Sequence, residues 1–231
     1  MGIIQNIARI NHLIDQAAIK YCRSPEDILL LAVSKQQTVE AIEEAYQQGL
    51  SQFAESYYQE GYEKIQRLKE LPICWHFIGP VQSNKTKGIA TCFSWVHSLN
   101  RKDIALKLNK FRSDDLAPLN VCLHINLVKE ETKSGIHPGE ALDLALYVSQ
   151  LPHLKLRGLM TIPPPQNNEE EQYALFLQLR ELMHSLNQQL KLNMDTLSMG
   201  MSNDFIPAIR AGSTVVRIGS AIFGERKRKA L

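Results

Sequence analysis

Lys35 is the residue whose surroundings point most directly to covalent chemistry. It follows the apolar run Ile28–Val33 and is separated from it only by Ser34. A short apolar run bounded by turn signals is typical of a strand that is buried on both faces. An amine at the end of such a strand is partly shielded from water, which favours the neutral form that attacks an aldehyde to give a Schiff base. The alternative interpretation is an ordinary lysine that packs its stem against the protein and keeps its charge in water.

Two segments near the C-terminus have the composition of a phosphate site. One is Ser198-Met199-Gly200-Met201-Ser202 and the other is Arg217-Ile218-Gly219-Ser220, and each continues an apolar strand pattern. Glycine lets the backbone approach an anion, while serine hydroxyls and backbone N–H groups can donate hydrogen bonds to it. A P-loop is excluded, because Glu225-Arg226 stands where that motif requires Lys followed by Ser or Thr.

Metal binding is the competing interpretation of the polar residues. His76, His97 and His124 fall on three successive predicted strands, but no His-x-His or His-x-x-x-His spacing occurs and no carboxylate cluster accompanies them. Histidines with partners in the core or at the surface are therefore favoured over metal ligands, and we expect no bound metal. The 4 cysteines form no C-x-x-C pair, which indicates reduced thiols in a cytoplasmic protein.

Apolar periodicity predicts alternating helices and strands along the chain. The N-terminal stretch has helical spacing at Ile3, Ile7, Ile10, Ile14 and Ala17. Strand patterns are found at 28–33, 52–54, 74–79, 95–97, 121–127, 156–161, 196–199 and 214–218. Helical patterns fill the gaps, most clearly from Glu169 to about Leu190. Thr38 stands at a predicted helix start, and Pro138 at the first turn of a helix over 139–150.

This alternation predicts an α/β fold, a single (β/α)8 TIM barrel over residues 1–231 with an extra N-terminal helix. A doubly wound open sheet fits less well, because no Gly-x-Gly-x-x-Gly follows the first strand. We expect the extra helix to cover one end of the barrel. Ligands of such barrels bind where the strands end at their carboxyl side.

The predicted site consists of residues at or just beyond these strand ends. They are Lys35, Ser56, Met160, Ser198, Gly200, Ser202, Arg217, Gly219 and Ser220. A Schiff-base lysine and a phosphate site in one barrel mouth suggest a phosphorylated aldehyde, above all pyridoxal 5'-phosphate (PLP).

Composition excludes several other classes of protein. The 26 basic and 24 acidic residues nearly balance, which argues against a dedicated binder of nucleic acid or anionic membranes. The longest apolar run, Ile28–Val33, is far shorter than the roughly 20 residues that span a bilayer. The basic tail Lys227-Arg228-Lys229 is interpreted as a solvated chain end. We expect a cytoplasmic protein that binds neither nucleic acid nor membrane.

The sequence resembles the pyridoxal-phosphate homeostasis protein family, small relatives of the alanine racemase barrel. The motifs that carry the resemblance span nearly the whole chain: Leu31-Ala32-Val33-Ser34-Lys35, Trp75-His76-Phe77-Ile78-Gly79, Gln82-Ser83-Asn84-Lys85, Lys133-Ser134-Gly135, Arg157-Gly158-Leu159-Met160-Thr161-Ile162-Pro163, residues 197–202 and residues 212–219. The resemblance implies an alanine racemase-like barrel without the C-terminal β domain. It also implies PLP on Lys35, phosphate contacts from Ser198, Ser202, Gly219 and Ser220, and Arg217 near the pyridine nitrogen.

One stretch departs from the family pattern. Phe53-Ala54-Glu55-Ser56 stands where the family usually shows Phe-Gly-Glu-Asn. The family asparagine approaches the cofactor ring, and Ser56 is shorter, so we expect it to leave that contact to water.

Two functions compete: a PLP carrier and a PLP-dependent amino-acid racemase. Racemisation by two bases needs one base on each face of the substrate carbon, and Lys35 is the only candidate we find. The related racemases take a catalytic tyrosine from a further domain, whereas this chain ends about a dozen residues after its last predicted strand. The resemblance points to vitamin B6 and amino-acid homeostasis without robust catalysis. We therefore expect no catalytic residue, a monomer, and PLP-dependent apo-enzymes as recipients of the cofactor.

Overall fold

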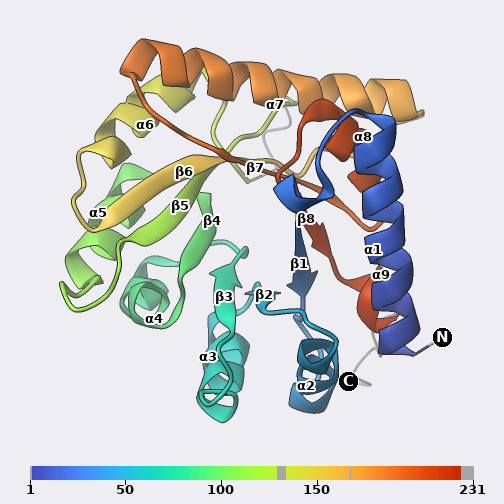
Figure 1. The fold of residues 1–231 in the computed structure, drawn as a ribbon. Helices are drawn as coiled ribbons and strands as arrows, with labels where there is room; N and C mark the ends of the chain where they lie inside the picture. Colours follow the sequence, from blue (N-terminus) through green and yellow to red (C-terminus); the bar gives the residue numbers. More distant parts are fainter. Residues whose placement is uncertain (1, 129–133, 167, 225–231) are drawn as a thin grey trace.

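The computed structural model describes residues 2–128, 134–166 and 168–224 as a closed barrel of parallel strands surrounded by helices (Figure 1). Each strand pairs with the next in sequence, and β8 closes the barrel by pairing with β1. The strands are β1 (Leu29–Val33), β2 (Gln52–Glu55), β3 (Cys74–Phe77), β4 (Trp95–Leu99), β5 (Leu119–His124), β6 (Leu154–Met160), β7 (Thr196–Met201) and β8 (Val215–Ile218). The predicted (β/α)8 barrel is confirmed.

Helices connect the strands and form the outer layer of the barrel. They are α1 (Ile3–Lys20), α2 (Val39–Gln47), α3 (Tyr58–Arg67), α4 (Thr86–Cys92), α5 (Lys102–Phe111), α6 (Ala141–Ser149), α7 (Glu169–Leu190), α8 (Phe205–Ala211) and α9 (Ser220–Phe223). Short 3-10 turns lie at η1 (Pro25–Asp27), η2 (Ser83–Lys85) and η3 (Pro138–Glu140). The predicted helix 139–150 is thus η3 followed directly by α6, with Pro138 in its first turn.

Local signals in the sequence explain where the helices begin. Thr38 caps α2, because its Oγ1 accepts a hydrogen bond from the N–H of Ala41 at 3.2 Å. Asn168 caps α7 in the same way through the N–H of Glu171. Helix α7 has the bounds that the periodicity predicted, and Phe176, Leu179 and Leu186 on its apolar stripe are buried.

Helix α1 lies in the outer layer and does not cover an end of the barrel, so that expectation is wrong. Its buried residues are Ile7, Ile10, Ile14, Ala17 and Ala18. The helix packs against α2, α8 and α9 along the side of the barrel (Figure 1). The physical reason is that α9 has only 4 residues, so that within the described part of the chain no long helix follows β8 to cover β8 and β1. The apolar stripe of α1 covers that side instead.

The barrel interior combines a small apolar cluster with polar side chains. Leu31, Val33, Ala54 and Val215 pack together inside it, while Phe53 belongs to the larger core shared with the helices. This alternation along β2 sends Glu55, like Phe53, toward the helix layer. In the described ranges no helix is long and apolar enough to cross a membrane. Lys133 of the Lys133-Ser134-Gly135 motif and the basic tail at 227–229 lie outside the described residues.

Candidate functional site

A cavity of about 750 Å³ opens at the carboxyl ends of β1, β7 and β8. It brings together six of the nine predicted site residues: Lys35, Ser56, Ser202, Arg217, Gly219 and Ser220. The remaining three, Met160, Ser198 and Gly200, do not line it. Six residues near the strand ends therefore share one cavity, in the place where barrels of this kind bind ligands. The other three lie outside the cavity lining.

Lys35 enters the cavity from the turn that follows β1. The N–H of Gln37 donates to the carbonyl oxygen of Ser34 at 3.0 Å and closes this turn. Gln36 has a φ of 62°, in the left-handed region that non-glycine residues adopt at a cost. The Lys35 side chain is half-buried and lines the cavity. Its position agrees with the prediction of a lysine at the end of a buried strand.

Two serine hydroxyls from the neighbouring segments after β7 and β8 meet at the cavity. Ser220 Oγ donates to Ser202 Oγ at 3.3 Å, and the N–H of Ala221 points at the same oxygen from 3.4 Å. Gly219 lies beside them, and a Cβ built on it would stand 3.3 Å from the carbonyl oxygen of Val33. The loops after β7 and β8 thus present hydroxyls and a side-chain-free backbone to one space, which is the chemistry that anion binding needs.

Arg217 supplies a buried positive charge at the floor of the cavity. Its Nη1 donates to the carbonyl oxygen of Ser198 at 2.5 Å and to Ser198 Oγ at 2.9 Å, and its Nη2 donates to the carbonyl oxygen of Thr161 at 2.9 Å. Burial lowers the pKa of Arg217 to about 10, which still leaves the guanidinium protonated at neutral pH. Its orientation is fixed by Ser198 of β7 and by Thr161, which directly follows β6.

Ser198 lies below the cavity, in the polar interior of the barrel. The residue is fully buried, and its hydroxyl is 2.7 Å from His97 Nδ1. His97 Nε2 in turn is 2.9 Å from His76 Nδ1, and His76 Nε2 is 2.8 Å from Gln52 Oε1. These contacts form a continuous hydrogen-bonded chain across the barrel from Gln52 to Arg217.

The groups at the two ends of this hydrogen-bonded series determine which atom donates and which accepts in each of its hydrogen bonds. Gln52 Oε1 only accepts, so His76 Nε2 carries the proton and its Nδ1 accepts from His97 Nε2. His97 Nδ1 then accepts from the Ser198 hydroxyl, whose oxygen accepts from the guanidinium. Burial lowers the pKa of His76 to about 3 and that of His97 well below its usual value, so both rings are neutral.

Gly200 and Met160 support the site from outside the cavity. Gly200 has a φ of 94°, and a Cβ there would stand 2.7 Å from the Cβ of Ala208, so this position of β7 requires glycine. Met160 is buried at the end of β6 and pairs with Ser198 in the sheet register.

Sequence analysis missed several polar residues that line the cavity, among them Asp204 and Gln172. Asp204 accepts a hydrogen bond from the N–H of Met201 at 2.6 Å, and burial raises the pKa of its carboxyl group. Gln172 accepts from the N–H of Gln166, and its Nε2 has no partner within the described part of the chain. Asp204 follows the Ser202 motif closely and could have been included. Gln172 lies inside a long helix, where no local pattern marks it.

Comparison with known proteins places the chain in a family. The model of the alanine racemase N-terminal domain matches residues 7–227. Proteins named pyridoxal phosphate homeostasis protein match over nearly their whole length: 51% identity in Pasteurella multocida, covering 98% of each chain, and 50% in Pseudomonas aeruginosa, covering 97% of this chain and 96% of the relative. The chain belongs to this family.

Solved structures give the same result. PipY of Synechococcus elongatus matches with a TM-score of 0.85 and 33% identity, covering 96% of this chain and 100% of PipY. PipY has been solved both without PLP and with PLP bound. Alanine racemase of Clostridium difficile matches with a TM-score of 0.74 at 15% identity, and this chain covers 57% of that enzyme. That likeness concerns the barrel fold alone. The family resemblance and the alanine racemase-like barrel are both confirmed.

Proposed function

We propose that this protein binds PLP in the cavity, holds it as a Schiff base on Lys35 and serves PLP homeostasis without robust catalysis. The observation that carries the proposal is that Lys35 and the facing hydroxyls of Ser202 and Ser220 line one cavity with a buried cation at its floor. The names of the relatives and the PLP-bound PipY structure support it.

The residues present fit the chemistry of PLP. Ser202, Gly219 and Ser220 would hold the phosphate, because hydroxyls and exposed backbone N–H groups are suited to an anion. Arg217 would face the pyridine nitrogen, and Ser56 would lie beside the ring. When bound, PLP supplies an aldehyde that condenses with a lysine amine with loss of one water. Ser198 would act indirectly, because its hydroxyl already binds Arg217 and His97.

The lining of the cavity gives little support to racemisation. Two-base racemisation needs a second proton carrier facing Lys35. Among the described residues no tyrosine, histidine or cysteine lines the cavity, and of the two carboxyl groups that do, Asp204 is bound to the N–H of Met201 and Glu169 is exposed in the first turn of α7. Arg217 keeps its own proton at neutral pH, because its pKa of about 10 is well above 7. A guanidinium at the pyridine nitrogen would leave the ring nitrogen unprotonated in a carrier and in a racemase alike, so Arg217 does not discriminate between the two functions.

Transfer of PLP to other proteins is the activity that we propose for this site. The open cavity would let an incoming amine reach bound PLP at Lys35, so that the site would release PLP to an amine or to a PLP-dependent apo-enzyme. We propose that such apo-enzymes are the recipients and that the protein acts as a monomer. A cytoplasmic location agrees with the cysteines, which are all free thiols among the described residues.

A transfer assay with the PLP-loaded protein tests this function. The loaded protein is mixed with an apo-enzyme, and recovery of the recipient's activity is followed over time, with the Lys35→Ala variant as control. In parallel, a panel of L-amino acids is tested for racemisation, decarboxylation and transamination. We expect transfer and unchanged amino acids. Turnover near the ordinary enzyme median of about 10 s⁻¹ on any of them would overturn the carrier function in favour of the racemase.

A further inference from the structure

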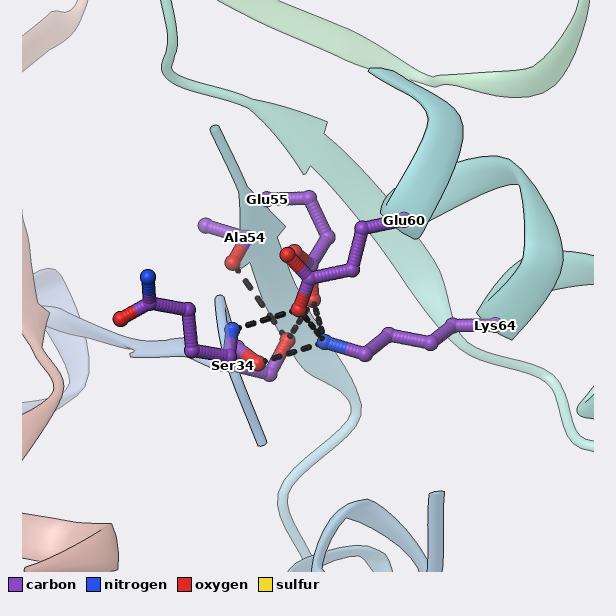
Figure 2. Close-up of polar contacts among 6 residues, drawn as sticks. Ser34, Ala54, Glu55, Glu60 and Lys64 are labelled. Carbon is purple, nitrogen blue, oxygen red and sulfur yellow. Dashed lines mark hydrogen bonds and ion pairs between the residues drawn. The ribbon is translucent and has the colours of Figure 1, made fainter. Parts of the chain in front are cut away.

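A buried cluster of charged side chains lies between β2 and α3, beside the turn that carries Lys35 (Figure 2). Glu55, at the end of β2, is fully buried, and its Oε1 lies 2.8 Å from Lys64 Nζ and 2.7 Å from Ser34 Oγ. Lys64 Nζ also donates to the carbonyl oxygen of Ser34 at 2.7 Å and to Glu60 Oε1 at 2.6 Å. None of these four residues lines the cavity.

The cluster is a poor device for stability alone. Removing a carboxylate and an ammonium from water is expensive, and apolar side chains of similar volume usually hold two elements together at least as well. Glu55 Oε2 has no hydrogen-bond partner within the described residues, so the carboxylate is not even fully satisfied. The position of the polar contacts therefore requires another explanation.

The contacts of the cluster converge on the two neighbours of Lys35. Ser34 is held through its hydroxyl by Glu55 and through its carbonyl oxygen by Lys64. Gln36 donates its backbone N–H to Glu60 Oε1. Gln36 has a φ of 62°, where glycine is usually found, and such a residue persists only when its surroundings hold it. The cluster thus fixes the backbone on both sides of the lysine.

We propose that Lys64, bridging Glu55 and Glu60, is a positioning residue for Lys35. It holds the turn 34–37 in its left-handed form, so that the amine enters the cavity in the geometry that reacts with an aldehyde. A small displacement of a reacting group slows a reaction strongly, because the group then adopts the aligned geometry only a small fraction of the time. This inference rests on the proposed Schiff base at Lys35 and assigns the residues that prepare it.

The test compares variants that release the turn with a control that weakens the fold elsewhere. Glu60→Ala removes the anchor of Gln36 at a partly exposed position. The double variant Glu55→Gln with Lys64→Met removes both charges of the fully buried pair, and only the partly exposed Glu60 loses its cation. Glu60→Gln keeps an oxygen acceptor and serves as the rescue. Arg112→Met is the matched control, because the buried Arg112 guanidinium binds the carbonyl oxygens of Ala90 and Phe93, and Arg112 is not a lining residue of the cavity.

Two readouts are measured for each variant. The first is hydrogen exchange of the peptide containing residues 34–37 in the cofactor-free protein. The second is the rate at which PLP and borohydride label Lys35, read by peptide mass spectrometry. If the left-handed conformation of Gln36 is no longer held, the ratio of the native turn to other backbone conformations should fall roughly five- to thirtyfold. We expect exchange to accelerate and labelling to slow by about that factor in Glu60→Ala and in the double variant, with partial recovery in Glu60→Gln and no change in Arg112→Met.

The possible failures are distinct. Labelling of Lys35 at the wild-type rate in Glu60→Ala would overturn the positioning role, even if the double variant does not fold. Equal slowing in Arg112→Met would also overturn it, because a general loss of stability would then explain the effect. Absence of any label on Lys35 in the wild-type protein would overturn the proposed function itself and this inference with it.

Discussion

His97 Nδ1 lies 2.7 Å from the hydroxyl of Ser198, and the same hydroxyl oxygen accepts a hydrogen bond from Arg217 at 2.9 Å. Ser198 therefore joins the neutral histidines of the barrel interior to the cation at the cavity floor. A serine so engaged below the cavity has a different role from Ser202, which lines the cavity itself.

We expect Ser198→Ala to weaken the fold more than it weakens phosphate recognition. The substitution leaves His97 Nδ1 buried without a donor, and an unsatisfied buried acceptor costs about 1–3 kcal/mol. Urea unfolding should show a loss of that size. The ratio of the dissociation constants for PLP and pyridoxal should stay at the wild-type value. A large change in this ratio would instead mean that Ser198 binds the phosphate directly.

Ser202→Ala and Ser220→Ala should show the opposite behaviour. A hydrogen bond to a charged group contributes about 1.5–3 kcal/mol, so each variant should raise the dissociation constant for PLP roughly ten- to hundredfold. Pyridoxal, which lacks the phosphate, should bind as before. Ser149→Ala is the control, because that hydroxyl is exposed and bonds the carbonyl oxygen of Leu146 in its own helix. Unchanged PLP binding in both cavity variants would move the phosphate elsewhere.

The buried His76 should make the protein less stable in mild acid. Burial lowers the pKa of His76 to about 3 in the folded state, whereas an unfolded histidine titrates near about 6.5. Below that pH the unfolded chain binds a proton that the native state excludes, so the free energy of unfolding falls as pH falls. Between about pH 7 and pH 5 this contributes about 2 kcal/mol.

The comparison with His76→Met isolates this contribution. Urea unfolding of both proteins at the two pH values gives the pH-dependent loss for each. The variant should lose about 2 kcal/mol less than the wild type, because every other titrating group, including the carboxyl group of Glu55 with its raised pKa, is common to both. An equal loss in the two proteins would show that His76 is accessible to protons in the native state.

Gly200→Ala should destabilise the protein more than an alanine at another left-handed glycine. Gly200 and Gly49 both have positive φ values, of 94° and 89°. A Cβ at Gly200 would stand 2.7 Å from Ala208 Cβ, whereas a Cβ at Gly49 would meet nothing within 4 Å. Backbone strain alone costs about 1–2 kcal/mol, so Gly49→Ala should lose about that much and Gly200→Ala clearly more. Equal losses in the free energy of unfolding for the two variants, measured by thermal or urea unfolding, would contradict the predicted clash with Ala208.

The fold was predictable because its signals are local. The periodicity of α7, the cap at Thr38 and the buried run of β1 depend on neighbouring residues. Strand bounds were less exact, as β5 begins at Leu119 although the apolar pattern was assigned from Val121. The placement of α1 depends on how short α9 is, which no local pattern of α1 contains.

The sequence predicted that the site lies at the strand ends, but it did not predict which residues line the cavity and which lie below it. Ser198 lies within β7 and Ser202 directly follows it. The register with β8 shifts between Ser198 and Met201, and the two serines lie at different levels of the barrel. The partners of Ser34 were not predictable either. Lys64 comes from a helix whose spacing resembles an ordinary solvated surface, and only the tertiary structure buries its ammonium group against Glu55.

Borohydride reduction of the PLP-loaded wild-type protein, followed by peptide mass spectrometry, tests the central claim most directly. Reduction converts the Schiff base into a stable amine and marks the lysine that carried PLP. Lys35 lines the cavity that contains Ser202, Arg217 and Ser220, so the account predicts one phosphopyridoxyl group on the peptide that contains Lys35 and none in Lys35→Ala. A label on another lysine, or wild-type labelling in Lys35→Ala, would contradict it.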